Sequence, residues 1–474
     1  MSSWASIATI AADVNSGKTT ALSNVETALK NIEAASEFKA IIATTAERAR
    51  ERAAIIDNIV KSGKSAGRLA GVPFIAKDNF LVFGAETTAA SNILKGFNAP
   101  YQSSAIEKLE AEGALCVAKA NLDAFAHGSS TENSDFFTTL NPRDKTRVPG
   151  GSSGGSGAAV VLGLAPFALG TDTGGSIRLP ASFTGCVGLK PTYGLVSRSG
   201  VVAMASSLDC IGPLTTTVED AALVLDVMSG KDPLDSTTIE RDESAYTDLN
   251  GDIKGITIGV IKEYMGEGLD PEVKSLIEAA TEKLKAAGAI IKDVSLPSLP
   301  LALAVYYIVC PAEVSSNLSR YDGQRFGYSD PDATTLDESY ELSREKGFGK
   351  EAKRRIMIGT YVLSSGYYNA YYKKAQTVRT KLINEFKATF EEVDFLLGPT
   401  APTTAFKIGE NSDDPLKMYL IDIMTVAANL VGAPSMSVPC GEVEGLPVGL
   451  QLMAAQTHDR ELLSLAKVYE GVRG

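Results

Sequence analysis

The stretch PGGSSGGSGAAVVLGLAPFALG, residues 149–170, passes without a break from glycine and serine into apolar sequence. A flexible linker would not be joined directly to core residues, so we interpret the glycines as the opening of a helix. The apolar residues that follow predict a buried helix and then a strand. The N-terminus of such a helix can face a polar group. This stretch therefore predicts a helix and a strand of one core, with a functional glycine-rich turn before them.

The same succession of helix and strand occurs elsewhere in the chain. Residues 103–121 predict a helix followed by a strand, and residues 254–261 predict another strand. Residues 270–288 predict a helix with Asp270 as its N-cap, and residues 289–296 predict the next strand. Strands that alternate with helices indicate an α/β fold with a largely parallel or mixed sheet.

Three further segments complete the expected architecture. Residues 21–62 carry apolar side chains at three- and four-residue spacing, which predicts N-terminal helices. Many short elements between residues 300 and 380 predict a helical insertion. Residues 434–454 predict two strands joined around Gly441–Gly445, as a hairpin at the edge of the sheet. Because no internal repeat and no long linker interrupt the sequence, we expect one large α/β domain.

Composition limits the classes of function. The 474 residues carry a net charge of −12, which argues against binding nucleic acid through a broad basic surface of this chain. The five cysteines are scattered, with no CxxC pair or Cys/His cluster, so we expect neither disulfides nor a metal site. No basic segment with an apolar core opens the chain, and the apolar run Ala158–Leu169 is too short to span a bilayer. We therefore expect a cytoplasmic protein without membrane contact.

The most informative motif is TDTGGSIRLP, residues 171–180. Two glycines free the chain to present successive N–H groups to one concavity, which is how an oxyanion is held. We expect the amides of Thr173, Gly174, Gly175 and Ser176 to form this nest. The serine at its end is placed to attack a carbonyl whose oxygen the nest binds. The motif therefore predicts nucleophilic catalysis by Ser176 rather than a simple tight turn.

The base for such a serine has two candidates. His127 is the only histidine suited to a Ser–His–Asp triad, because His458 is expected at an exposed helix start. Lys77 ends the apolar segment VPFIAK, where it is either a surface cation or a desolvated amine. Desolvation lowers the pKa of a lysine and makes it a possible base. We favour Lys77.

The segment NSGKTT, residues 15–20, is reminiscent of a phosphate-binding loop. That motif requires a glycine five residues before Gly17, where this chain has Ala12, and no apolar strand precedes it. We expect a polar turn between helices and no nucleotide site.

Three motifs together carry a resemblance to a known family. GVPFIAKDNF, PGGSSGGSGAAV and GTDTGGSIRLPASFTGCVGLKPTYGLVSRSGV follow one another at the spacing of the amidase signature family, which the chain resembles. The resemblance implies an unusual Ser–cis-Ser–Lys triad, with Ser176 as nucleophile, Ser152 as bridging hydroxyl and Lys77 as base. It also implies a single α/β/α domain around a large mixed β-sheet.

The outer segments are similar to one branch of this family, the glutaminase subunits of tRNA-dependent amidotransferases. The similarity is carried by PAEVSSNLSRYDGQRFG, by GKEAKRRIMIGTYVLSSGYYNAYYKKAQTVRTKL and by LLGPTAPTTAF with the sequence that follows. It implies that Arg355 binds the α-carboxylate of free glutamine and that Asp422 binds its α-ammonium group. Tyr306 is a further implied contact, although the adjacent Tyr307 leaves the register open.

The resemblance extends over residues 1–474, with N-terminal helices (21–62), a catalytic core (63–230) and a helical, substrate-binding part (300–430). One departure lies in this chain's DAFAHGSS, where the family usually has DEFAMGSS. Ala124 and His127 therefore leave the shape of that loop open.

The resemblance also implies partners. The chain would release ammonia from glutamine and pass it to a kinase-like transamidase partner, the B subunit, in a heterotrimer with a small third partner, the C subunit. The B subunit would use ATP and Mg²⁺ and would make most of the contact with tRNA, while this chain would carry no cofactor. The substrate would be misacylated Glu-tRNA(Gln), Asp-tRNA(Asn) or both. The alternatives are a stand-alone amidase for small amides and a catalytically inactive scaffold, and weaker than both is an ATP-binding protein.

Overall fold

The computed structural model describes residues 4–411 and 414–473, so residues 1–3, 412–413 and 474 of the expected domain lie outside it. One sheet of 11 strands forms its centre. Across the sheet the strands are β1 (Ile41–Thr44), β3 (Leu115–Ala120), β2 (Pro73–Lys77), β4 (Phe167–Asp172), β6 (Cys210–Thr215), β5 (Val187–Lys190), β10 (Ser435–Val443), β11 (Leu446–Ala454), β9 (Phe395–Pro399), β7 (Thr257–Ile261) and β8 (Ile290–Val294). Strand β2 pairs in parallel with β3 and β4, whereas β4 and β6 are antiparallel, so the sheet is mixed.

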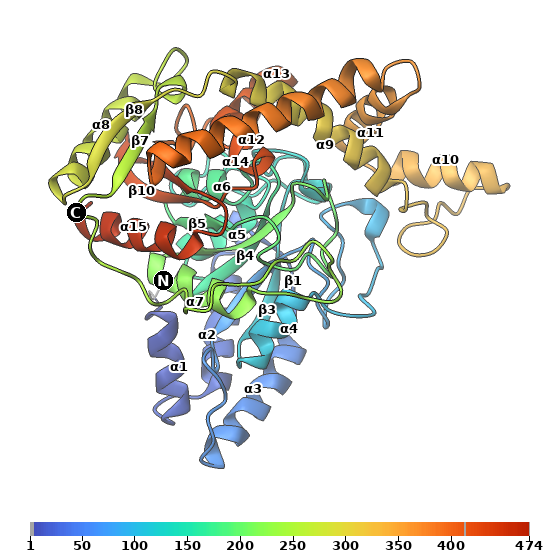
Figure 1. The fold of residues 1–474 in the computed structure, drawn as a ribbon. Coiled ribbons are helices and arrows are strands. Elements are labelled where there is room, and N and C mark those ends of the chain that lie inside the picture. The colour runs from blue at the N-terminus through green and yellow to red at the C-terminus, as the bar shows by residue number, and fades with distance from the viewer. Residues whose placement is uncertain (1–3, 412–413, 474) are drawn as a thin grey trace.

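Helices cover both faces of this sheet (Figure 1). They are α1 (Ile7–Asn15), α2 (Ala21–Ala34), α3 (Ala46–Lys61), α4 (Ser104–Ala111), α5 (Gly154–Val161), α6 (Arg178–Thr184), α7 (Val218–Met228), α8 (Pro271–Ala286), α9 (Ala302–Leu318), α10 (Leu336–Gly347), α11 (Lys350–Leu363), α12 (Lys374–Glu392), α13 (Pro415–Leu420), α14 (Val426–Leu430) and α15 (Asp459–Val472). In β2, Phe74 and Ala76 pack in one apolar cluster with α4 and α7, while Ile75 packs in another with α2, α3 and α5. This alternation confirms the predicted α/β/α architecture around a mixed sheet.

Most of the predicted elements are present. The helix and strand expected in residues 103–121 are α4 and β3, and residues 149–170 form the turn, α5 and most of β4. Asp270 caps α8 and accepts hydrogen bonds from the next two free amides of the helix. One element was missed: β1 lies within residues 21–62, between α2 and α3, and pairs antiparallel with β3. Its four residues, IIAT, are too few to show the period of a strand.

The sequence predicts the hairpin of residues 434–454 at the edge of the sheet, and that prediction is wrong. Strands β10 and β11 lie inside it, because β10 also pairs with β5 and β11 also pairs with β9. All nine residues of β11 are buried. A strand buried on both faces has a nearly continuous apolar sequence, and LQLMA is such a run.

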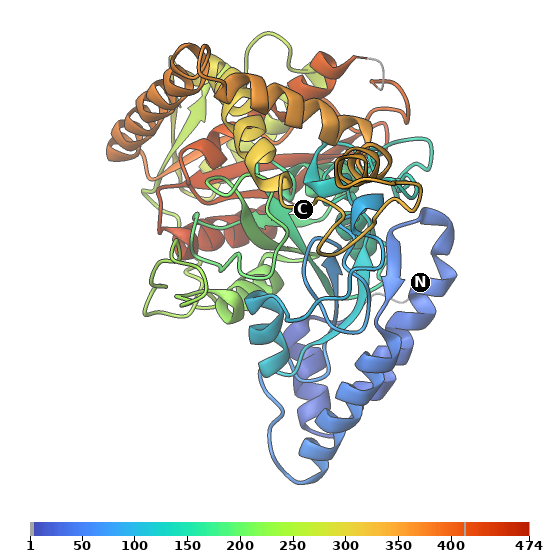
Figure 2. The same cartoon turned by 90° about the vertical axis from the view of Figure 1, so that its right-hand side faces the viewer.

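The segment after residue 300 is helical, as predicted, with helices longer than expected. Figure 1 shows α9, α11 and α12 side by side along one end of the sheet, and Figure 2 shows the N-terminal helices as a projection at the opposite end. The stretch Leu299–Leu318 is long and apolar enough to cross a membrane by length and composition. Half of it is buried within the protein, with Pro311 inside the helix, and its residues belong to the main apolar cluster. It therefore packs as a core helix of this domain.

Candidate active site

The carboxyl ends of two neighbouring parallel strands position the site. Lys77 is the last residue of β2, and Ala76 lies opposite Leu169 of β4. Lys77 therefore lies beside the segment in which β4 passes into the glycine nest. Ser152 and Ser153 precede α5, and the Ser153 N–H donates to the backbone oxygen of Ser176 at 3.1 Å. The fold thus brings all three candidate catalytic residues to one place.

The Lys77 ammonium group is completely buried among hydroxyl groups. Its Nζ lies 2.7 Å from Ser152 Oγ, 2.8 Å from Ser153 Oγ and 3.0 Å from Thr171 Oγ1. Burial lowers the pKa of Lys77 from 10.5 to about 7, against the opposing effect of nearby carboxylates, of which Asp123 is the strongest. A large fraction of the amine is therefore neutral near pH 7, as a base requires. The Gly151–Ser152 peptide bond is cis.

Hydrogen-bond counting shows which way the neutral amine points. A neutral lysine has two N–H donors and one lone pair. Ser153 Oγ donates to the Thr171 backbone oxygen at 3.2 Å, so it can only accept from Lys77. Thr171 Oγ1 already accepts from Asn79 Nδ2 at 3.1 Å and can accept the second lysine N–H. The lone pair is then left for the Ser152 hydroxyl. Ser153 and Thr171, which the sequence did not single out, orient the candidate base Lys77.

The nest is held by a buried ion pair that the sequence analysis did not identify. Asp172 accepts from the amides of Gly175 at 2.9 Å and Ile177 at 3.1 Å, and it pairs with Arg178 at 2.9 Å. Burial alone would raise the pKa of Asp172, but Arg178 holds it well below its usual range. Arg178 also donates to Gln451 and Asn429 on distant segments. The clamp therefore fixes the turn that carries Ser176.

The amides of the nest are not equivalent. Those of Thr173, Gly174 and Ser176 have no acceptor within the described part of the chain, so they are free to bind an oxyanion. The Gly175 amide would have to leave Asp172 first. Gly175 has φ +135°, and a Cβ there would lie 2.2 Å from Thr425 Oγ1. Glycine is therefore required at this position for conformation and space.

We expect Arg178→Ala to lower the free energy of unfolding by about 3–5 kcal/mol, because it leaves Asp172 as a buried charge without its partner. Urea unfolding followed by circular dichroism measures the change. Arg50→Ala is the control, since the Arg50–Glu26 pair is half exposed and its loss should change stability little. Equal stability of Arg178→Ala and the wild type would show that the clamp is dispensable.

A second set of residues, which includes two buried charged side chains, lies close to the nest. Arg355 of α11 is buried, donates from Nε to Glu351 Oε1 at 2.8 Å, and lies 5.4 Å from the centre of the Tyr307 ring. Asp422 accepts from Ser129 Oγ at 2.7 Å and Tyr307 Oη at 2.9 Å. Burial raises the pKa of Asp422 to about 6.

Asp422 accepts side-chain hydrogen bonds only from neutral groups and forms no ion pair in the described ranges 4–411 and 414–473, although the Arg355 charge lowers its pKa slightly against the larger effect of burial. A buried carboxylate in this state would gain from an added cation. A cavity of about 170 Å³ is lined by Arg355, by Tyr419 and by Ser129, the residue that donates to Asp422. The arrangement suits a small molecule with one negative and one positive group.

The two adjacent tyrosines have different contacts. Tyr307 is bonded to Asp422 and lies beside Arg355, whereas the ring of Tyr306 packs against the nest. A Cβ added to Gly174 would lie 2.6 Å from Cζ of Tyr306. The direct contact with the charged residues is therefore made by Tyr307, and Tyr306 forms a wall beside the nest.

The histidine alternative for the base finds no support in the geometry. His127 is buried, and neither ring nitrogen has a hydrogen-bond partner among the residues described, so it does not activate a serine. Ala124 of the same loop is also buried. His458 immediately precedes α15, as expected of a helix start.

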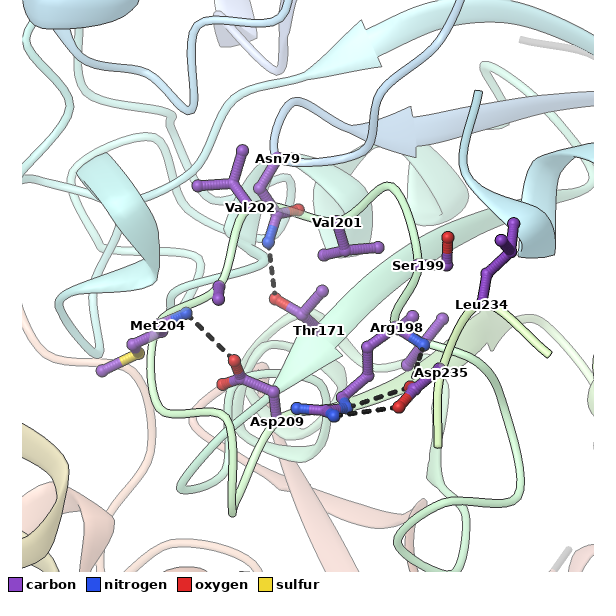
Figure 3. Close-up of a pocket in the computed structure, with 12 residues that line it drawn as sticks. Asn79, Thr171, Arg198, Ser199, Val201, Val202, Met204, Asp209, Leu234 and Asp235 are labelled. Carbon is purple, nitrogen blue, oxygen red and sulfur yellow. Dashed lines mark hydrogen bonds and ion pairs between the residues drawn. The ribbon is translucent and has the colours of Figure 1, made fainter. Parts of the chain in front are cut away.

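A separate cavity of about 170 Å³ is lined by Asn79 and Thr171 among others (Figure 3). Asn79 and Thr171 form the wall shared with Lys77, and Asp209, which accepts from Thr173 Oγ1 at 2.6 Å, forms the wall shared with the nest. Arg198 and Asp235 form an ion pair in its lining. Polar side chains beside the candidate base and the nest thus share this pocket with apolar residues such as Val202 and Met204.

Comparisons with known proteins assign the chain to a family whose members include amidases, in agreement with the arrangement of Ser176, Ser152 and Lys77. A family model described as Amidase matches residues 23–463, and the chain therefore belongs to the amidase signature family. A solved bacterial aryl acylamidase of that family is 26% identical, with a TM-score of 0.88 over 99% of this chain and 96% of the other.

Relatives with higher sequence identity indicate one group of proteins within this family. The chain is 52% identical to the A subunit of glutamyl-tRNA(Gln) amidotransferase from Koribacter versatilis, over 95% of each chain. It is also 52% identical to the A subunit from Caldanaerobacter subterraneus subsp. tengcongensis, over 92% of this chain and 89% of the relative. The crystal structure of the A subunit from Thermotoga maritima is 40% identical, with a TM-score of 0.79, and the match covers 95% of this chain and 91% of the other. The chain thus closely resembles the A subunits of glutamyl-tRNA(Gln) amidotransferases.

Proposed function

We propose that this chain is the glutamine-hydrolysing subunit of a tRNA-dependent amidotransferase. One observation carries the proposal: the buried Arg355 lines a cavity together with Ser129, and Ser129 donates to Asp422, a buried carboxylate that forms no ion pair within the described residues. Thr425 bonds to the backbone oxygens of both Asp422 and Gly174, so this carboxylate lies close to the nest. A zwitterionic amino acid would supply Asp422 with a cation and would offer its carboxylate to the Arg355 guanidinium, whose Nε already pairs with Glu351, whereas a neutral amide would leave Asp422 without an ion-pair partner. Glutamine has the two charged groups and a side-chain amide that can reach the nucleophile.

In the proposed mechanism, Ser176 Oγ attacks the side-chain carbonyl of glutamine. Its proton passes to Ser152, whose own hydroxyl proton passes to neutral Lys77. The free amides of the nest bind the oxyanion, and each such donor is worth about 100–1,000-fold in rate. Protonated Lys77 then returns a proton through Ser152 to the departing nitrogen, which leaves as ammonia. Water hydrolyses the remaining acyl-enzyme by the same relay and releases glutamate.

We propose further that the ammonia is used by partners in a heterotrimer. A kinase-like B subunit would bind ATP and Mg²⁺, activate a misattached Glu on tRNA(Gln), Asp on tRNA(Asn) or both, and accept the ammonia, together with a small C subunit. The acidic chain described here would contact tRNA mainly through the B subunit and would act in the cytoplasm. The similarity to the A subunits over almost the whole chain supports this assignment. A stand-alone amidase for small amides is the second candidate, because the family includes the aryl acylamidase.

The charged-group site can be tested with Arg355→Ala. Glutamine should bind more weakly by about 2–5 kcal/mol, because its carboxylate loses a buried partner. The α-carboxamide analogue of glutamine, which has no carboxylate, should lose much less. Hydrolysis rates for both substrates measure the difference, with Lys353→Ala on the same helix as the control. Equal losses for the two substrates would show that Arg355 is structural.

Dependence on partners separates the two candidate functions. We expect slow hydrolysis of glutamine by the isolated chain and faster hydrolysis when the B and C subunits are added. If the partners are coupled to the active site by a free energy of ordinary size, the rate of glutamine hydrolysis should rise roughly 5- to 150-fold. A further rise is expected with ATP and misacylated tRNA, since ligands that favour the competent arrangement shift its population. Full activity of the isolated chain, unchanged by partners, would favour the stand-alone amidase.

A further inference from the structure

A threonine outside the proposed triad ties together the two ends of the turn that carries Ser152. The Thr131 hydroxyl donates to the Gly150 backbone oxygen at 2.8 Å and accepts from the Gly154 N–H at 3.1 Å. These two backbone groups lie on either side of Ser152 in the sequence. Thr131 is completely buried, so its hydroxyl uses its only proton within the protein. One hydroxyl group thus closes the turn around Ser152.

The segment that carries Thr131 packs directly against this turn. A Cβ added to Gly151 would clash with Asp123 Oδ2 and with the Ser130 nitrogen. A Cβ added to Gly154 would clash with Thr131 Oγ1. Glycine is therefore needed at both positions for the close approach of the two segments. A displacement of the Thr131 segment would also displace the turn.

Asp123 holds the two segments in place. Its carboxylate accepts from the backbone N–H groups of Thr131 at 2.9 Å and of Asn133 at 3.0 Å. Its own backbone N–H donates to the Ser152 backbone oxygen at 3.3 Å. Asp123 therefore connects the residue that carries the closing hydroxyl with the residue that carries the bridging hydroxyl of the relay.

The backbone of Thr131 is strained. Its φ is +65°, in the left-handed region that a β-branched residue rarely adopts. Glycine or asparagine would adopt this conformation at a lower free energy. Strained residues of this kind concentrate at functional sites, where the surrounding contacts maintain them. The hydroxyl that bonds to both ends of the turn gives a reason for a threonine here.

We propose that Thr131 is a positioning residue for the proton relay: its hydroxyl fixes the turn so that Ser152 Oγ stays within hydrogen-bond distance of Lys77 Nζ. The inference rests on the proposed role of Ser152 as the bridging hydroxyl. Ser152 Oγ and Lys77 Nζ are 2.7 Å apart in the structure. A misplacement of about 1 Å in a reacting group can lower the rate about 100-fold. Thr131 is not among the described residues that line the cavity with Arg355, so its loss should affect turnover more than glutamine binding.

Thr131→Val tests this role, because valine keeps the shape and the β-branch but has no hydroxyl. We expect kcat for glutamine to fall about 100-fold while KM stays nearly unchanged. Thr131→Ser keeps the hydroxyl and should keep most of the turnover. Thr139→Val is the matched control: it removes another buried hydroxyl, which donates to the Lys39 backbone oxygen at 2.8 Å, and should leave kcat nearly unchanged. A wild-type kcat in Thr131→Val, or a raised KM with an unchanged kcat, would overturn the inference.

A second variant covers the case in which Thr131→Val does not fold. Thr131→Gly adopts the left-handed conformation without strain and also lacks the hydroxyl. Circular dichroism should show that it is folded, and its kcat should fall like that of the valine variant. Wild-type turnover in a folded Thr131→Gly chain would contradict the proposed role.

A fluorophosphonate tests the relay without glutamine. Ser176 Oγ displaces fluoride from phosphorus, and the serine proton passes to the relay. The rate of this reaction should fall in Thr131→Val and stay near the wild-type rate in Thr131→Ser, whereas equal rates in all three chains would overturn the inference. A wild-type chain that reacts with the fluorophosphonate but does not hydrolyse glutamine, alone or with its partners, would instead refute the proposed glutaminase function.

Discussion

Ser176→Ala should abolish glutamine hydrolysis while the chain remains folded. Loss of a serine nucleophile from a triad reduces turnover by about a millionfold in a serine protease, and an effect of that order is expected here. The fold should persist because the hydrogen bond from the Ser153 amide goes to the backbone oxygen of residue 176, which alanine keeps. Assays of ammonia release over time measure the loss of activity, and circular dichroism measures whether the chain remains folded.

A trapping experiment locates the nucleophile directly. A glutamine-like electrophile should form one covalent adduct, which mass spectrometry should find on the peptide that contains Ser176. Ser316→Ala, an exposed position on α9, is the control and should react like the wild type. An adduct on Ser152, Ser153 or a cysteine would contradict the assignment.

The elements that the sequence predicts correctly are those whose signals are local. The glycines of residues 149–157 and the nest at Gly174 and Gly175 show directly where the backbone must turn or approach closely, and Lys77 follows immediately on an apolar strand. The position of the β10–β11 hairpin depended instead on which strands flank it, and β1 was too short for its periodicity to be visible.

The missing parts of the site are long-range contacts. The bond between Ser129 and Asp422 joins residues 293 positions apart, and the Arg178 bond to Gln451 joins residues 273 apart. No periodicity or spacing reports such pairs. The Asp172–Arg178 clamp is different: both residues flank the glycines in TDTGGSIR, and the need to hold a nest of free amides in place was the signal that could have identified them.

The residues beside the cavity that Asn79 and Thr171 line are only partly predictable from the sequence. Asn79, which lines it, lies two residues after Lys77 in sequence, yet its role is visible only through Thr171, whose hydroxyl it shares with the lysine. A residue that orients a base through another hydroxyl has no sequence signature of its own. The structure therefore adds most information about the site where a residue's role follows only from counting hydrogen-bond donors and acceptors.

Lys77→Arg should lose about 100- to 10,000-fold in turnover, the usual contribution of a general base. Arginine keeps the positive charge but cannot be deprotonated in this pH range, and its planar group does not fit a pocket built around a single nitrogen. In the wild type, activity should rise with pH through the lysine pKa of about 7, because only the neutral amine accepts a proton. Both variant and wild type are measured by ammonia release between pH 5 and 9.

Lys77→Met separates catalysis from folding. The pKa of Lys77 is about 7 in the folded chain and 10.5 as its ordinary value, so between these pH values the unfolded chain binds the extra proton. Stability of the wild type should therefore rise with pH across this window. Lys77→Met should lose that rise along with its activity, because it has no proton to bind. A Lys77→Arg enzyme with near-wild-type turnover would contradict the assignment of Lys77 as the base, and His127→Ala would then be the next variant to test. An inactive Lys77→Met chain that unfolds like the wild type in urea at high pH would show that Lys77 is needed for catalysis and not for folding.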